Sequence, residues 1–146
     1  MSDFRQLSES VWASPQITLA DVAAAAAAGV TVIINNRPEG ESPDQVPGPD
    51  IAAAATAAGM AYYAIPVTHA GFSREQVNEM QAALSAAGGR VLAYCRSGTR
   101  STLLWSLAEA AAGRDPQQIA EAASAAGYDV SPVQSLIDGL YAEAKG

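Results

Sequence analysis

Apolar and polar positions along the chain repeat a unit of helix, glycine and strand. The alanine-rich runs "VAAAAAAG" (22–29) and "IAAAATAAG" (51–59) each end in a glycine, and a β-rich segment follows each of them. A glycine just past a helix is a common C-cap, and short β-branched or aromatic runs favour strands. The pattern therefore predicts helices that alternate with strands, rather than low-complexity sequence.

Residue types at the ends of these runs set the predicted boundaries. Thr18 with Asp21, and Ser73 with Gln76, fit the capping box that begins many helices. The predicted helices are 19–28, 49–59, 73–87 and three that begin near Arg100, at Asp115–Pro116 and at Ser131–Pro132, with Asp115 and Ser131 as N-caps. The predicted strands are 30–35, 60–67 and 90–95, with "SVWAS" near residue 12 as an additional edge strand.

Strands that alternate with helices predict a mostly parallel sheet covered by helices on both faces. We therefore predict an α/β fold with a central sheet of four to five strands and a single domain over residues 1–146. The one long irregular stretch, "NRPEGESPDQVPGP" (36–49), follows the strand at 30–35. Open α/β sheets bind ligands at the carboxyl ends of their strands, so this loop is predicted to border a ligand site.

Composition and charge restrict the partners. The 146 residues contain 8 Lys and Arg against 15 Asp and Glu, a formal net charge of −7 at pH 7. Nucleic acids and anionic membranes bind to basic faces, so we predict neither as a partner. A single cysteine forms no internal disulfide, and "MSDFRQLSES" lacks a signal-peptide core, which favours a cytoplasmic location. The sequence does not indicate the oligomeric state.

The single cysteine lies in "CRSGTRS" (95–101), between a predicted strand and a predicted helix. Backbone N–H groups at such a junction converge on one point and bind anions. With charge from Arg96 or Arg100, they should stabilise the thiolate of Cys95, which favours a nucleophile over an inert buried thiol. Gly98 permits backbone geometry that a side chain would block, and the planar fork of Arg100 suits two oxygens of an oxyanion.

Neighbouring hydroxyl groups complete this predicted cradle. Ser97 and Thr99 lie within the loop, so we predict that they contact the bound anion. Ser101 and Thr102 lie on the first helical turn, where they are expected to hydrogen-bond the thiolate or its leaving group.

A second candidate segment is "INNRPEGE" (34–41), at the end of the predicted strand 30–35, whose end should lie beside that of the Cys95 strand. We predict that Asn35, Asn36, Arg37 and Glu39 rim the pocket, with Asn36 and Arg37 binding the substrate anion. The alternative is that the asparagines only turn the chain. In that case Arg37 and Glu39 form a surface pair worth under about 1 kcal/mol.

The loop "CRSGTRS" resembles the active-site loop of the cysteine-dependent tyrosine and dual-specificity phosphatases and of the rhodanese sulfurtransferases. The wider chain is similar to the phosphatase-like domain of the beta-lactamase hydrolase-like proteins, in "SPQIT", "GVTVIINNRPEGE", "YYAIPV", "GGRVLAYCRSGTRSTLLW" and the C-terminal helices. This resemblance implies a compact dual-specificity-phosphatase fold. It also implies that Cys95 forms a covalent intermediate, that Arg100 clamps the oxyanion, and that Ser101 assists breakdown of the intermediate.

Two departures from that pattern affect the chemistry. Such phosphatases place five residues between cysteine and arginine, whereas Cys95 and Arg100 enclose four, the rhodanese spacing. A shorter loop suits a single transferred sulfur atom better than a phosphoryl group. The general-acid aspartate is also missing from "IPVTHAGFS" (65–73). His69, the only histidine, is a candidate replacement because imidazole exchanges protons near neutral pH, although a solvated loop histidine is the alternative.

The sequence therefore leaves three functions open. The first is hydrolysis of a small anionic phosphoester through a Cys95 intermediate. The second is sulfur transfer through a Cys95 persulfide, and the third is a non-catalytic anion-binding module. No dissociable cofactor is implied, and one cysteine with one histidine does not make a zinc site.

Overall fold

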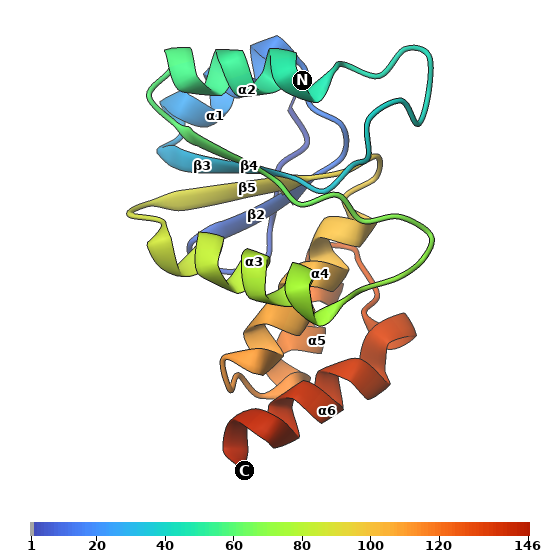
Figure 1. Cartoon of the computed structure of the whole chain (residues 1–146). Coiled ribbons are helices and arrows are strands. Elements are labelled where there is room, and N and C mark those ends of the chain that lie inside the picture. The colour runs from blue at the N-terminus through green and yellow to red at the C-terminus, as the bar shows by residue number, and fades with distance from the viewer. Residues whose placement is uncertain (1) are drawn as a thin grey trace.

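The computed structural model describes residues 2–146 and contains a five-stranded sheet between layers of helices (Figure 1). The strands are β1 (Arg5–Gln6), β2 (Val11–Ser14), β3 (Val30–Asn35), β4 (Ala61–Ala64) and β5 (Arg90–Tyr94). Their order in the sheet is β1-β2-β5-β3-β4. β1 pairs antiparallel with β2, and every other neighbouring pair is parallel. The mostly parallel sheet of the α/β prediction is confirmed.

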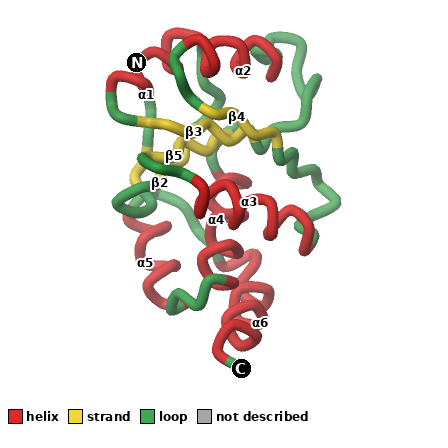
Figure 2. Tube along the Cα trace, turned by 60° about the vertical axis from the view of Figure 1, so that its left-hand side comes forward, coloured by secondary structure: helices red, strands yellow, loops and turns green. Residues whose placement is uncertain are grey.

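The helices cover both faces of this sheet, as predicted (Figures 1 and 2). They are α1 (Leu19–Ala27), α2 (Gly48–Ala57), α3 (Arg74–Ala86), α4 (Thr99–Ala111), α5 (Pro116–Ala125) and α6 (Gln134–Lys145), with a 3-10 turn η1 (Ser131–Val133) before α6. One face carries α1 and α2, and the other carries α3 and α4. α5 and α6 pack on α4 as an outer layer. Across residues 2–146, none of the helices combines the length and hydrophobicity that a membrane crossing requires.

Two apolar clusters, one on each face, hold the layers together. Ile33 and Leu92 point into the cluster under α1 and α2, whereas Ile34 and Ala93 point into the cluster that α3 and α4 cover. This alternation is the period of two that a strand buried on both faces requires. It anchors β3 and β5, the two strands whose carboxyl ends carry the candidate site.

Local signals in the sequence specified several helix ends correctly. The Thr18 hydroxyl accepts a hydrogen bond from the Asp21 amide at 3.1 Å, and the Ser73 hydroxyl accepts one from the Gln76 amide at 3.2 Å. Both capping boxes are complete. Gly29 follows α1 with a φ of +89°, a conformation that disfavours residues with a Cβ atom.

Three predictions were wrong, one about the place of a strand in the sheet and two about where elements begin or end. β2 is not at the edge of the sheet, because β1, too short to give a pattern in the sequence, pairs outside it. β4 ends at Ala64 rather than at residue 67. Pro66 lies just beyond this end, and because proline has no N–H group it cannot donate a hydrogen bond to a neighbouring strand. Ser131 does not cap α6, because its amide and hydroxyl both donate to Asp129, at 2.9 and 2.8 Å, and a 3-10 turn intervenes.

Candidate active site

The Cys95 loop connects the end of β5 to the first turn of α4. Cys95 directly follows β5 and is fully buried, with 0% of its surface exposed. The Gly98 amide donates a hydrogen bond to its Sγ atom at 3.1 Å. A backbone N–H at the start of a helix can stabilise negative charge, so the loop places one such donor directly against the Cys95 sulfur.

Gly98 is the N-cap of α4 and has a φ of +92°, in the left-handed region. A Cβ atom there would collide with the phenol oxygen of Tyr128. The Gly98 carbonyl accepts hydrogen bonds from the amide and the hydroxyl of Thr102, at 3.0 and 2.9 Å. We expected the Thr102 hydroxyl to hydrogen-bond the thiolate or its leaving group. Instead it donates to the Gly98 carbonyl and stabilises the start of the helix.

Arg100 lies beside Cys95 and is held by two other loops. Its Nη1 and Nη2 atoms donate to the two carboxylate oxygens of Glu41 at 2.7 and 2.8 Å, and Nη1 also donates to the Val67 carbonyl at 2.8 Å. The hydrogen bonds to Glu41 raise the pKa of Arg100, and its electrostatic interaction with Cys95 acts in the same direction. The guanidinium therefore stays charged, with its plane fixed by the bidentate pair.

Glu41 is a site residue that the sequence analysis missed. Its Oε1 atom also accepts from Nε of Arg37 at 2.9 Å, so one carboxylate joins two arginines. Hydrogen bonds from Arg100, and next from Arg37, lower the pKa of Glu41 to about 2. Glu41 is therefore ionised throughout the neutral range and does not supply a proton there. No local signal marked it, since Arg100 is 59 residues away along the chain.

Arg37 is only 5% exposed, so its interpretation as half of a surface pair with Glu39 is wrong. Besides Glu41, it donates to Gln16 Oε1 at 2.9 Å and to Ser42 Oγ at 3.2 Å. Glu39 instead accepts from the Gly48 amide at 2.8 Å. These bonds pin both ends of the loop that follows β3.

The asparagines lie where the parallel register predicted. Asn35 is the partner of Tyr94 in the β3–β5 ladder, so the ends of the two strands are side by side. The Asn35 side chain donates to the Tyr62 hydroxyl and accepts from the Arg37 amide, both at 2.9 Å. Asn36 donates to the Ile65 carbonyl at 2.9 Å, and its buried Oδ1 has no partner within residues 2–146.

The other predicted site residues are placed as follows. Ser101 is fully buried on α4, and its hydroxyl has no partner in the described part of the chain. Arg96, Ser97 and Thr99 are exposed, and the Ser97 hydroxyl donates to that of Thr99 at 3.0 Å. His69 is exposed in a turn that begins at Thr68. That turn starts next to Val67, whose carbonyl bonds Arg100.

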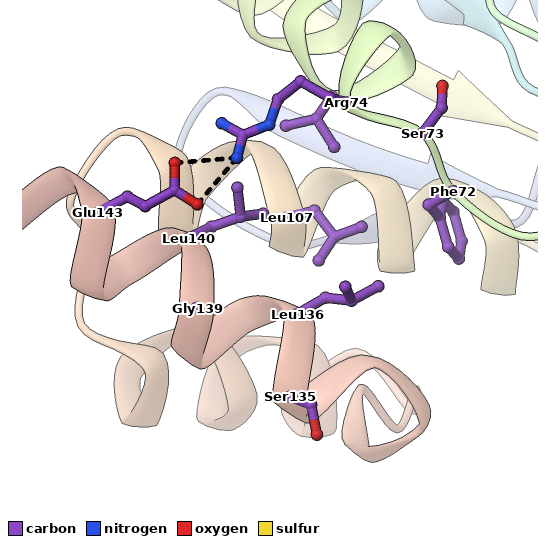
Figure 3. A pocket seen from close by; sticks show the side chains of 10 residues that line it. Phe72, Ser73, Arg74, Leu107, Ser135, Leu136, Gly139, Leu140 and Glu143 are labelled. Atoms are coloured by element: carbon purple, nitrogen blue, oxygen red, sulfur yellow. Dashed lines mark hydrogen bonds and ion pairs between the residues drawn. The ribbon is translucent and has the colours of Figure 1, made fainter.

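A groove elsewhere on the molecule shares no residue with the Cys95 loop (Figure 3). It has a volume of about 180 Å³ and lies between the start of α3, α4 and α6. Leu107, Leu136 and Leu140 line it, and an Arg74–Glu143 ion pair of 2.8 Å crosses it. Because none of the residues that line it belongs to the Cys95 loop, the groove and the loop are separate features.

The family model for the phosphatase-like domain of the beta-lactamase hydrolase-like protein matches residues 3–112. A beta-lactamase hydrolase-like protein of Xylella fastidiosa is 40% identical over 104 residues, 70% of this chain and 24% of its own length. One from Agrobacterium fabrum is 37% identical over 109 residues, 75% of this chain and 25% of its own length. The chain thus spans about a quarter of the length of the curated relatives it matches.

Solved structures share the fold over nearly the whole chain. A candidate phosphatase from Neisseria meningitidis has a TM-score of 0.83 and 33% identity, covering 96% of this chain and 99% of that one. A candidate phosphatase from Shewanella putrefaciens has a TM-score of 0.77 and 25% identity, covering 99% and 94%. Pseudomonas aeruginosa TpbA in complex with pTyr has a TM-score of 0.68 and 18% identity, covering 99% and 91%. The fold expected from the resemblance is confirmed, and the C-terminal helices belong to it although the family match ends at residue 112.

Proposed function

The chain belongs to the family of phosphatase-like domains of the beta-lactamase hydrolase-like proteins, and from this membership we propose that it hydrolyses a small anionic phosphoester through Cys95. The observation that carries the proposal is the 3.1 Å hydrogen bond from the Gly98 amide to Cys95 Sγ, at the head of α4 and beside Arg100. A thiolate held in this way is a nucleophile at neutral pH.

In the proposed reaction, the Cys95 thiolate attacks phosphorus, an S–P bond forms, and the P–O bond to the alcohol breaks. His69 gives its proton to the leaving oxygen. Water then attacks phosphorus with His69 accepting its proton, the S–P bond breaks, and phosphate leaves the restored thiolate. The unpartnered hydroxyl of Ser101 is free to hydrogen-bond that departing thiolate.

The oxyanion is held by amides and by Arg100. Arg100 uses Nη1 and Nη2 on Glu41, and in the proposed complex its Nε–H donates to an equatorial oxygen of the phosphoryl group. Amides of the 96–99 loop supply further donors, and Arg96, Ser97 and Thr99 lie at its exposed rim. Asn36 and Arg37 border the same end of the sheet.

The proposed substrate class is an aryl or alkyl phosphate of small size. The TpbA structure holds pTyr in the same fold, which supports an aryl phosphate as the first compound to test. A formal charge of −7 also makes this chain a poor partner for large polyanions.

Sulfur transfer is the second candidate, and one observation favours it. Cys95 and Arg100 enclose four residues, so the loop offers fewer amides than a phosphatase loop of five. A persulfide on Cys95 would be stabilised by the same Gly98 amide and Arg100 charge.

Incubation with an aryl phosphate and, separately, with thiosulfate should distinguish the two candidates. We expect catalytic release of phosphate from the first and no stable change in intact mass from the second, because the proposed nucleophile attacks phosphorus. A mass gain of one sulfur atom without phosphate turnover would establish sulfur transfer instead. If neither reaction occurs, and if iodoacetamide alkylates Cys95 no faster than free cysteine, the protein is an anion-binding module rather than either enzyme.

Substitution of His69 tests the proposed general acid. His69→Ala should lower kcat/KM about 100-fold for alkyl phosphates and little for p-nitrophenyl phosphate, whose leaving group needs no proton. The measurement is the dependence of kcat/KM on the pKa of the leaving alcohol, which should steepen. Thr68→Ala is the control, because Thr68 caps the same turn through a 3.2 Å bond to the Ala70 amide. An unchanged slope in His69→Ala, or an equal change in the control, would remove His69 from this role.

A further inference from the structure

Tyr128 contacts the Cys95 loop from outside the segment that the family model matches. It lies in the turn after α5, and its hydroxyl donates to the Ser97 carbonyl at 3.1 Å. The phenol ring lies against Gly98, at the position where any Cβ atom on that residue would be. A residue 31 positions later in the chain thus touches the two residues at the centre of the loop.

The Ser97 carbonyl and the Gly98 amide belong to one peptide bond. No cis peptide bond occurs in residues 2–146, and in a trans peptide the C=O and N–H groups point in opposite directions. The carbonyl points outward to Tyr128, and the amide points inward to Cys95 Sγ at 3.1 Å. A hydrogen bond at one end of the peptide therefore sets the direction of the other end, and it also polarises the N–H group.

We propose that Tyr128 is a positioning residue, whose hydroxyl holds the Ser97–Gly98 peptide with its N–H directed at Cys95. This inference deepens the proposed function and rests on it, because it concerns the reactivity of the same thiolate. Without the Tyr128 bond the peptide plane is free to rotate, and the thiolate loses its closest backbone donor. Gly98 permits this arrangement, since only glycine leaves room for the phenol oxygen.

Tyr128 is itself held in place by the N-terminal strand. The Arg5 guanidinium lies over the phenol ring, 5.2 Å from its centroid, and Asp3 accepts two hydrogen bonds from Arg5. Tyr128 is 9% exposed, and burial raises its pKa, so the hydroxyl keeps its proton and remains a donor at neutral pH. The charged or titratable groups that act on the Tyr128 hydroxyl are Arg5, Asp3 and Cys95.

Tyr128→Phe tests the proposal, because it removes only the hydroxyl. Cys95 is the single cysteine, so the rate of alkylation by iodoacetamide reports on this thiol alone. We expect alkylation at pH 7, and kcat/KM for p-nitrophenyl phosphate, to fall about three- to tenfold. The pH at which alkylation reaches half of its plateau rate should also move upward, since a less stabilised thiolate forms at higher pH.

Tyr141→Phe is the matched control, since it removes the same group from α6. Both variants are compared at a temperature where circular dichroism shows them fully folded, and the control should keep the native alkylation profile. The proposal is overturned if Tyr128→Phe is alkylated at the native rate with the native pH profile, or if Tyr141→Phe shifts equally. Alkylation requires no phosphatase activity. Failure of the phosphoester proposal therefore appears in the native protein's turnover, separately from failure of this one.

Discussion

Cys95→Ser should abolish turnover of p-nitrophenyl phosphate, with kcat reduced about 10⁴-fold or more and the fold retained. A serine hydroxyl occupies nearly the same volume, which matters at a position with 0% exposure. Its proton, however, is held at neutral pH, so the Gly98 amide has no anion to stabilise. The measurement is steady-state phosphate release, with far-UV circular dichroism to establish that the variant is folded.

The control for this substitution is another buried position of α4. Ser106 is fully buried and its hydroxyl donates to the Leu103 carbonyl, so Ser106→Ala also changes a small buried side chain near the same helix. We expect this variant to keep kcat within about threefold, after allowance for one lost hydrogen bond. If Cys95→Ser retained more than about a tenth of the native kcat, Cys95 would not be the nucleophile.

Arg100→Lys should lower kcat/KM about 100- to 1,000-fold, although the positive charge is kept. The native guanidinium bonds both oxygens of Glu41 and the Val67 carbonyl, and in the proposed complex its Nε–H donates to the oxyanion. A lysine ammonium is one nitrogen and lacks the planar fork that fixes this geometry. Because the oxyanion charge is best matched in the transition state, the loss should fall mainly on kcat rather than on KM.

Two further variants control the arginine experiment. Arg114→Lys makes the same change in a pair with Glu109 at the end of α4, and should leave kcat/KM within about twofold because such a pair contributes little. Glu41→Gln removes the charge that orients Arg100 and should give an intermediate loss of about tenfold. Native kcat in Arg100→Lys, or equal losses in Arg100→Lys and Arg114→Lys, would show that Arg100 does not hold the oxyanion.

Much of the fold was predictable because its signals are local. A capping box such as Thr18 with Asp21 involves residues three apart, and a C-cap glycine such as Gly29 involves one turn of helix. The Cys95 loop was predictable for the same reason, since the cysteine, Gly98 and Arg100 lie within six residues. The place of β2 at the sheet edge was mispredicted for another reason, because β1, which pairs outside it, has only 2 residues and gives no pattern in the sequence.

The candidate site was less predictable, because its side chains are fixed by partners on other loops. One of the two interpretations paired Arg37 with Glu39 at the surface, yet the fold places it against Glu41 and Gln16. Thr102 was expected at the thiolate, yet its hydroxyl bonds the Gly98 carbonyl. In both cases a side chain had several acceptors within reach, and the closure of the loops selected one of them.

The sequence by itself determined the alternation of helices and strands, the position of Cys95 at a strand-to-helix junction, and the family. These follow from apolar periodicity and from residue types a few positions apart. Only the tertiary structure decided that Glu41 holds Arg100 across 59 residues and that Tyr128 holds the Ser97 carbonyl across 31. Such contacts depend on where separate loops meet once the two faces of the sheet are covered. With 15 acidic residues in the chain, no local pattern singles out the one that will lie beside Arg100.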